Sequence, residues 1–319
     1  MTEFADLTRR SGTRARVGNR ALEPADLVAT VVTCLIGEML PDGSSRGNGF
    51  GATLTYPARY ADEQVDALAA ALDAVGLGQV AVVAEPVAAV TWLEAEHGPL
   101  PPGLVLVYDL GGAGLDVTVV GVGGADRSHP IMGVSLRSTE FGGRAFDAAL
   151  AGYAGADPLA GAAQERVAGP RLAELRTRHI RDSLELVSRC LRFAQVTVSD
   201  IDCVLVVGGA ARPAEVSRVL VEELARPVIT APDPGRTIAD GAALIGRRAV
   251  VAAQVPKRPL RHGRARGHAA AMTLFPSRRT RRRWLGTGVA GGGRTAGFAT
   301  SFLTAGSGIR ARWARIGPR

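Results

Sequence analysis

One segment limits the folds open to this 319-residue chain more than any other. Residues 105–120 read Val-Leu-Val-Tyr-Asp-Leu-Gly-Gly-Ala-Gly-Leu-Asp-Val-Thr-Val-Val. Two runs of apolar and β-branched residues flank a turn that holds Gly111, Gly112 and Gly114, which predicts two strands joined as a hairpin. Asp109 and Asp116 stand on either side of that turn. The segment therefore predicts a β-hairpin with an acidic side chain at each end of its glycine turn.

Two interpretations of the glycine turn stay open from its residues alone. Glycine adopts positive φ and lets a backbone approach a ligand closely, so successive amide N–H groups can point at one anion. Asp109 would then hold a hydrated divalent cation beside a phosphate, because hard cations prefer carboxylate oxygens and water. The alternative is a plain hairpin, since glycine-rich turns between strands are common.

Other segments predict strands that alternate with helices. Residues 80–84 and 204–207 are short apolar runs that end at Glu-Pro and Gly-Gly, as buried strands that deliver residues to a cleft would. Residues 62–75 and 213–225 carry apolar residues at helical spacing, with Asp62 as the expected N-cap and Gly76 as the expected stop of the first helix. Alternating strands and helices predict sheets covered by helices, with ligands bound beyond the strand ends.

The glycine turn resembles the second phosphate loop of the DnaK (heat-shock 70) chaperones, which belong to the actin-like ATPase superfamily. Further segments match that family in its own order along residues 17–250, and the resemblance is closest to divergent DnaK-like proteins of actinobacteria. The matching segments are a strand and proline turn (Thr-Leu-Thr-Tyr-Pro-Ala-Arg-Tyr, 53–60), a helix start with an active-site glutamate (Val-Ala-Glu-Pro-Val-Ala-Ala, 83–89), a Gly-Gly-x-x-Phe-Asp turn (141–147), an adenosine loop (Val-Leu-Val-Val-Gly-Gly-Ala-Ala-Arg, 204–212) and the helix after it (233–243).

This resemblance implies an α/β fold, the two-lobed actin-like ATPase (ribonuclease H-like) nucleotide-binding domain, here incomplete. Residues 1–16 are expected to form a disordered N-terminus, 17–102 a partial lobe I, 103–250 a lobe II, and 251–319 a disordered tail rich in arginine and glycine. Lobe II is expected to lack most of the helical subdomain that grips one side of adenine in the family. Residues 171–194 resemble only the helices that come after that grip.

The resemblance also implies roles for individual residues. Asp109 and Glu85 match the family's metal-binding and water-positioning carboxylates, so the expected cofactors are ATP or ADP with Mg²⁺, which Asp109 would hold directly or through water. Pro57 matches the proline of the family's allosteric switch. From the residues alone, Glu85 is also explained as a charge favoured at a helix N-terminus, and Asp109 as a turn aspartate. The expected nucleotide-binding residues are Gly111, Gly112, Asp116, Gly142, Gly143, Gly208, Gly209 and Arg212, the last stacking on the base.

Several groups that the family uses for hydrolysis are missing from the sequence. The chain begins too late to contain the family's first phosphate loop, the only lysine is Lys257, and the threonine of the second phosphate loop falls on Gly114. Phosphoryl transfer needs charge neutralisation and an oriented water. We therefore expect a chaperone-type domain that binds an adenine nucleotide with weak or absent hydrolysis and has no peptide-binding domain. A co-chaperone or nucleotide-exchange protein is the expected partner.

Other functions stay open beside this one. A non-catalytic scaffold or interaction protein on an actin-like fold would explain the missing catalytic groups. A degenerate gene fragment would lack the first strands of lobe I and leave neighbouring strands with open edges. A sugar or acetate kinase of the same superfamily fits less well, because of the Glu-Pro-x-Ala-Ala segment and the Gly-Gly-x-x-Arg loop.

Charge is distributed unevenly along the chain. Residues 256–319 carry 15 of the 38 Lys and Arg and none of the 30 Asp and Glu. Residues 1–255 therefore have a formal net charge of about −7. This composition is expected first of a solvated, disordered tail, or of a frame change in a GC-rich gene. The second interpretation is a tail that attracts polyanions through counterion release.

Cysteines and apolar segments indicate the compartment. Cys34, Cys190 and Cys203 are odd in number and form no CxxC pair, which predicts reduced thiols in a cytoplasmic protein. The N-terminus has no apolar signal core. Residues 284–307 are rich in glycine and contain Arg294, so no membrane span is expected there.

Overall fold

The computed structural model describes residue 7 and residues 15–17, 20–39, 51–124, 128–154 and 169–254. All of these belong to one of the two compact units into which the chain divides. The predicted basic tail lies outside the described residues, apart from residues 251–254, which end the last helix. The predicted disordered N-terminus also lies outside them, apart from residue 7 and the start of the first strand at Ala15. Within the described ranges, no helix is both long and apolar enough to cross a membrane.

The part predicted as lobe I contains a small parallel sheet. In chain order its elements are β1 (Ala15–Val17), β2 (Arg20–Leu22), α1 (Pro24–Met39), β3 (Thr53–Tyr56), α2 (Asp62–Ala74), β4 (Ala81–Ala84) and α3 (Glu85–His97). Strands β1 and β2 are antiparallel, whereas β3 and β4 are parallel and joined through α2, as parallel neighbours require. Ala29, Leu72 and Val80 form part of a small core between α1, α2 and β4.

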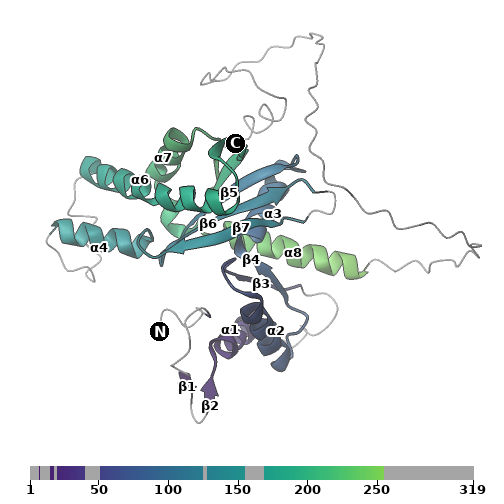
Figure 1. The fold of residues 1–319 in the computed structure, drawn as a ribbon. Coiled ribbons are helices and arrows are strands. Elements are labelled where there is room, and N and C mark those ends of the chain that lie inside the picture. The colour runs from purple at the N-terminus through teal and green to yellow at the C-terminus, as the bar shows by residue number, and fades with distance from the viewer. Residues whose placement is uncertain are drawn as a thin grey trace, which may run out of the picture. The chain divides into compact units, whose positions relative to one another are not determined.

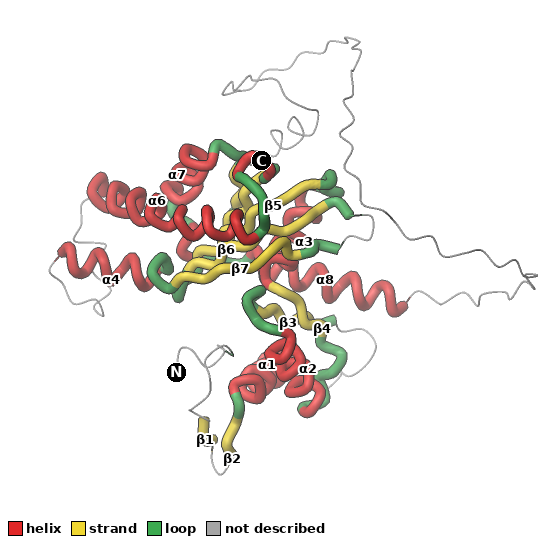
Figure 2. Tube along the Cα trace, viewed as in Figure 1, coloured by secondary structure: helices red, strands yellow, loops and turns green. Residues whose placement is uncertain are grey.

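The part predicted as lobe II is built on one five-stranded sheet (Figure 1, Figure 2). Its elements are β5 (Gly103–Leu110), β6 (Leu115–Val122), β7 (Ile131–Ser138), α4 (Gly143–Ala154), α6 (Gly169–Phe193), β8 (Cys203–Val207), α7 (Ala214–Leu224), β9 (Val228–Thr230) and α8 (Thr237–Gln254). The strand order is β7-β6-β5-β8-β9. Strands β5 and β6 pair antiparallel across the glycine turn, which confirms the predicted hairpin, and β8 runs parallel to β5.

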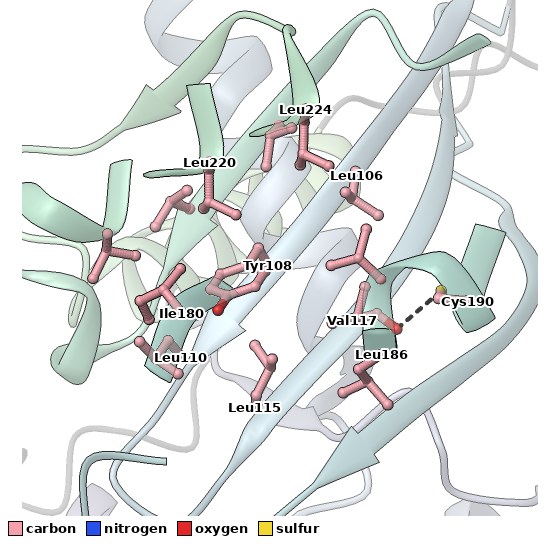
Figure 3. Close-up of a cluster of buried hydrophobic side chains, with 14 of the residues drawn as sticks. Leu106, Tyr108, Leu110, Leu115, Val117, Ile180, Leu186, Cys190, Leu220 and Leu224 are labelled. Atoms are coloured by element: carbon pink, nitrogen blue, oxygen red, sulfur yellow. Dashed lines mark hydrogen bonds between the residues drawn. The ribbon is translucent and has the colours of Figure 1, made fainter. Parts of the chain in front are cut away.

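The central strand β5 is buried because helices pack against both faces of the sheet. Leu106 and Tyr108 pack with α6 and α7, as Figure 3 shows, whereas Val105 and Val107 pack with α3 on the opposite face. Successive side chains of a strand point to opposite faces. A strand covered on both faces therefore reads as an unbroken apolar run, which is the pattern of residues 104–108.

The predicted helices are present, with small differences at their ends. The helix expected over 62–75 is α2, but its N-cap is Ala61, so the prediction of Asp62 as N-cap was wrong. Gln64 Oε1 accepts a hydrogen bond from the N–H of the N-cap residue Ala61 at 2.7 Å, as the side chain three positions after the N-cap does in a capping box. Gly76 follows the helix at φ +77°, as expected for its stop. Residues 171–193 of the segment 171–194 lie in one helix, α6.

Helices α3 and α8 approach each other closely at Gly241. A Cβ atom on Gly241 would overlap the carbonyl oxygen of Ala88 in α3. Only glycine permits this approach of two backbones. The glycine of the predicted helix 233–243 is therefore explained by packing.

Candidate functional site

Three glycine turns that are far apart in the sequence meet beyond the end of β5. The turn 111–114 follows β5, residues 142–143 lead into α4, and residues 208–210 follow β8. A Cβ on the first glycine of 142–143 would overlap the backbone of the 111–114 turn, and a Cβ on the second would lie 3.2 Å from Ala210 Cβ. Parallel strands β5 and β8 end at the same edge of the sheet, where ligands bind in open α/β sheets. The structure thus brings the predicted glycine segments together at one strand edge.

Asp109 lies beside these turns, near the end of β5. It is opposite Asp116 in the β5–β6 pairing and opposite Val207 in the β5–β8 pairing. Gly208 has φ +94°, and a Cβ on it would stand 2.5 Å from Asp109 Oδ1. Burial, and then the negative charge of Asp116, raise the pKa of Asp109 to about 7, although Arg137 opposes the rise. Asp109 is thus held where ionisation is costly without a nearby cation.

Glu85 is the first residue of α3 and lines a small cavity together with Asp109 and Asp116. The cavity measures about 10 Å³, which is room for about one water molecule. Burial, and then the charges of Asp109 and Asp116, raise the pKa of Glu85 to about 8. A helix N-terminus alone would favour the charged form and lower this pKa. Burial and the neighbouring carboxylates therefore outweigh the helix dipole at Glu85.

This donor set fits Mg²⁺ held through water. Among the residues that the structure describes, no group of three or more His, Cys, Asp or Glu is arranged to coordinate a metal ion by itself. Mg²⁺ keeps several waters and is usually bound by one or two carboxylates plus substrate phosphates. A hydrated cation beside Asp109 and Glu85 would favour the charged carboxylates and offset the rise in both pKa values.

Two arginines that the sequence did not predict lie at this carboxylate cluster. Arg137 is directly opposite Asp116 in the β6–β7 pairing, and its Nη1 donates to Asp116 Oδ2. Arg59, which follows β3, has its Nε 3.9 Å from Asp116 Oδ1. Both arginines lower the pKa of Glu85. The cluster therefore contains three carboxylates and two guanidinium groups.

A sequence signal for Arg137 existed in residues 131–138. Met132, Val134 and Leu136 alternate with Ser135 and Arg137, which is the period of a half-buried strand. Only the register against β6, however, places Arg137 opposite Asp116. The contact thus depends on a pairing that no local pattern specifies.

A larger cavity of about 340 Å³ lies next to the glycine turns. Of the predicted nucleotide-binding residues, Gly142, Gly143, Gly209 and Arg212 line it. The Arg212 guanidinium is exposed but anchored, because its Nε and Nη2 donate to Asp233 Oδ1 at 3.2 and 3.0 Å. This anchoring presents the guanidinium as a flat surface suited to stacking on an aromatic ring.

Helix α6 supplies another wall of this cavity through Arg176 and His179. The sequence predicted neither residue as part of the site. The Arg176 guanidinium lies 5.1 Å from the ring centroid of Phe146 and 3.4 Å from Glu215. The His179 ring lies 5.5 Å from that of Phe141. A cavity of this size with aromatic walls and a few polar groups is typical of a small-molecule site.

Backbone donors around the first glycine turn are engaged within the protein. The Gly111 N–H donates to the Gly114 carbonyl at 2.9 Å. The N–H groups of Gly143 and Arg144, at the start of α4, donate to the carbonyls of Gly111 and Gly112 at 3.0 and 2.9 Å. These three amides hold the turns together and are committed to protein acceptors.

Pro57 directly follows β3 and precedes Ala58, a residue that lines the carboxylate cavity. Its carbonyl accepts a hydrogen bond from the Tyr60 N–H at 3.0 Å, and the next residue, Ala58, lines the cavity with Glu85. Pro57 is thus one residue away from a wall of the cavity that Glu85 also lines. Its allosteric role remains a prediction.

Comparisons with known proteins identify the family of this chain. A family model described as "Hsp70 protein" matches residues 11–158 and 160–257. The chaperone protein HscA homolog of Pseudomonas fluorescens strain Pf-5 is 28% identical over 255 residues, which cover 69% of this chain and 40% of the relative. The corresponding homologs of Laribacter hongkongensis and Ralstonia nicotianae are 28% identical over 264 residues and 29% identical over 231 residues. These matches cover 69% and 61% of this chain, and 40% and 36% of the relatives.

The chain thus spans at most 40% of the length of these curated relatives. None of them supports the narrower resemblance to actinobacterial proteins. The family match confirms the predicted actin-like ATPase fold, in agreement with the mixed α/β architecture described above. Because the matching model covers well over half of the residues, the chain belongs to the Hsp70 family of chaperones.

Proposed function

We propose that this chain is an Hsp70-type nucleotide-binding domain that binds ATP or ADP with Mg²⁺ and hydrolyses ATP slowly or not at all. Hsp70 proteins in general bind these nucleotides. The observation that supports the proposal most is the meeting of three glycine turns beside Asp109, next to a cavity of about 340 Å³. Such a strand edge is where nucleotides bind in open α/β sheets.

The proposed roles follow the geometry of the two cavities. The base would lie in the larger cavity against Arg212, whose guanidinium Asp233 anchors. The phosphates would extend toward the 111–114 turn, with Mg²⁺ held by Asp109 through water and Glu85 positioning a water molecule. When bound, Mg²⁺ would neutralise charge on the phosphate oxygens. Pro57 as an allosteric residue, a co-chaperone or exchange partner, contact of the tail with polyanions and a cytoplasmic location belong to the same proposal.

Two features of the sequence near the proposed phosphate position support slow or absent hydrolysis. Residues 1–255 contain no lysine, and residue 114 is a glycine with no hydroxyl to donate. Arginine supplies positive charge, but with a planar geometry that differs from the compact lysine ammonium. Charge neutralisation of the transferring phosphate is a major part of catalysis. The residues present therefore support nucleotide binding better than they support ATP hydrolysis.

Isothermal titration with ATP in the presence and absence of Mg²⁺ tests this proposal. We expect binding at or below millimolar ATP, and we expect Asp109→Asn to weaken the dependence on Mg²⁺ more than Arg212→Ala does. Arg212→Ala should weaken the binding of adenosine and of ATP to the same extent, because Arg212 is proposed to stack on the base. Arg218→Ala, on the exposed face of α7, serves as the control for loss of one arginine. A folded protein that gives no heat at millimolar ATP would refute the proposal, and equal Mg²⁺ dependence in both variants would refute the assigned roles.

One observation favours a second candidate, a non-catalytic scaffold. The amides of Gly111, Gly143 and Arg144 donate to protein carbonyls, so the turns are stable without a phosphate. A scaffold would give no heat in the same titration and would retain its partner equally with and without ATP and Mg²⁺. A degenerate fragment is separated from both by circular dichroism, because it would lack a cooperative thermal transition.

A further inference from the structure

Arg137 occupies an unusual place beside the 111–114 turn. It is the residue before the last of β7 and lies directly across from Asp116, to which its Nη1 donates. Its side chain is 26% exposed and that of Asp116 is 15% exposed, so the pair lies at the edge of the buried cluster rather than inside it. The guanidinium is therefore held in place and still accessible to a ligand.

The Arg137 guanidinium lies next to Gly114 of this turn. A Cβ on Gly114 would lie 2.6 Å from the Ser138 carbonyl oxygen and 3.2 Å from both Cζ and Nη2 of Arg137. The Ser138 carbonyl oxygen thus excludes a side chain at residue 114, and the Arg137 guanidinium lies next to the same space. The resemblance placed a threonine hydroxyl at Gly114, and the structure places guanidinium N–H donors next to the same position.

A cationic donor would offset the negative charge at this end of the site. Glu85, Asp109 and Asp116 line one small cavity, and a polyphosphate arriving there would meet their negative charge. The amides of Gly111, Gly143 and Arg144 are committed to protein carbonyls. A guanidinium binds phosphate oxygens through two parallel N–H bonds, and it makes such bonds equally with carboxylates. Asp116 and a phosphate are therefore alternative partners for Arg137.

We infer that Arg137 is the ligand of the terminal phosphate in this chain. Asp116 holds the guanidinium while the nucleotide is absent and exchanges it for phosphate oxygens when the nucleotide binds. Arg59 then remains near Asp116 to offset its charge. Arg137 thereby makes the site select nucleoside polyphosphates over adenosine. This inference rests on the proposed function, because it assigns a residue to the same site.

The test is titration of adenosine, ADP and ATP, the nucleotides with Mg²⁺, into the full chain and four variants. The variants are Arg137→Gln, Asp116→Asn, the double variant of both, and Arg218→Gln as a charge-matched control. Arg137→Gln should weaken ATP binding by about tenfold or more, as expected for a lost charge-assisted bond, and adenosine binding by less than about twofold. Arg218→Gln should change neither.

Asp116→Asn separates exchange of partners from simple charge repulsion. It should tighten ATP binding in the wild-type background, because it releases Arg137, and this gain should shrink in the Arg137→Gln background. An equal gain in both backgrounds would show that Asp116 acts through repulsion alone and would overturn the exchange. If Arg137→Gln changes the affinity for adenosine as much as the affinity for ATP, or changes neither, the proposed role of Arg137 in phosphate binding is overturned.

Two further outcomes are decisive. If the wild-type chain binds neither adenosine nor ATP, the proposed function fails and this inference fails with it. If the wild type binds both and the variants do not discriminate between them, the inference alone fails. Should Arg137→Gln not fold, Arg137→Lys replaces it, since lysine keeps the charge but not the paired donors. A partial loss specific to ATP supports the inference, and no loss specific to ATP overturns it.

Discussion

Asp109→Asn should make this chain more stable at high pH relative to wild type, measured without Mg²⁺ and nucleotide. Burial and the charge of Asp116 raise the pKa of Asp109 from 3.8 to about 7 in the folded protein. The folded state therefore holds this proton at pH values where the unfolded chain has already lost it. The stability that results is fully present below about pH 4 and is lost as the pH rises to about 7.

The magnitude follows from the rise of about three pH units in this pKa. At about 1.4 kcal/mol per unit, ionised Asp109 costs the folded state about 4 kcal/mol above pH 7. Asparagine cannot ionise, so the variant avoids this cost. The free energy of unfolding of the variant minus that of wild type should rise by about 3 kcal/mol between pH 5 and pH 8. The constant cost of burying the amide cancels, because only the change with pH is compared.

Urea unfolding at a series of pH values in EDTA measures this difference. Asp66→Asn, which removes an exposed carboxylate on α2, is the matched control and should give a flat difference. An Asp109→Asn difference that is flat as well, or that falls as the pH rises, would contradict the raised pKa of Asp109. A falling difference would mean that ionised Asp109 stabilises the fold, as it would in a structural ion pair.

Three further predictions test the packing that supports the site. Gly241→Ala should lower the free energy of unfolding by about 1–3 kcal/mol or more, because its methyl group would overlap the backbone of α3. Gly37→Ala, in α1 with nothing within 4 Å of its Cβ, should instead stabilise by about 0.5–1 kcal/mol, so urea unfolding of the pair should give opposite signs. Tyr108→Phe should cost about 1 kcal/mol in the same assay through loss of the 2.8 Å bond to Ser183, and no change would contradict the buried contact. Leu220→Ala should cost about 2–5 kcal/mol through the cavity it leaves in the core between the sheet and α7, and a cost below 1 kcal/mol would show that this core is not packed as described.

The sequence predicted the parts of the site that local pattern determines. Asp109 and Glu85 each stand where an apolar run ends, so their placement at the end of β5 and the start of α3 follows from the strand and helix signals themselves. Gly142 and Gly143 were identified by the resemblance, and their close contact with the 111–114 turn gives a physical reason for glycine there.

The residues that the sequence did not predict depend on pairing between distant segments. Arg137 reaches Asp116 only through the register of β7 against β6, and Arg176 and His179 reach the larger cavity only through the packing of α6. Such contacts depend on the pairing of two strands or on the packing of a helix face. The spacing of residues along one element predicts neither. Asp62 shows the same limit at small scale: the N-cap is Ala61, and Gln64, three residues after Ala61, accepts the hydrogen bond from the Ala61 N–H.

The glycine turns beside Asp109 are proposed to form a site for an adenine nucleotide. A crystal structure of the full chain with Mg²⁺ and a non-hydrolysable ATP analogue tests this proposal most directly. We predict the base in the cavity against Arg212, and the terminal phosphate beside the 111–114 turn with Arg137 turned from Asp116 toward it. The account is contradicted if saturating analogue leaves this cavity without nucleotide, or if the nucleotide binds elsewhere on the chain.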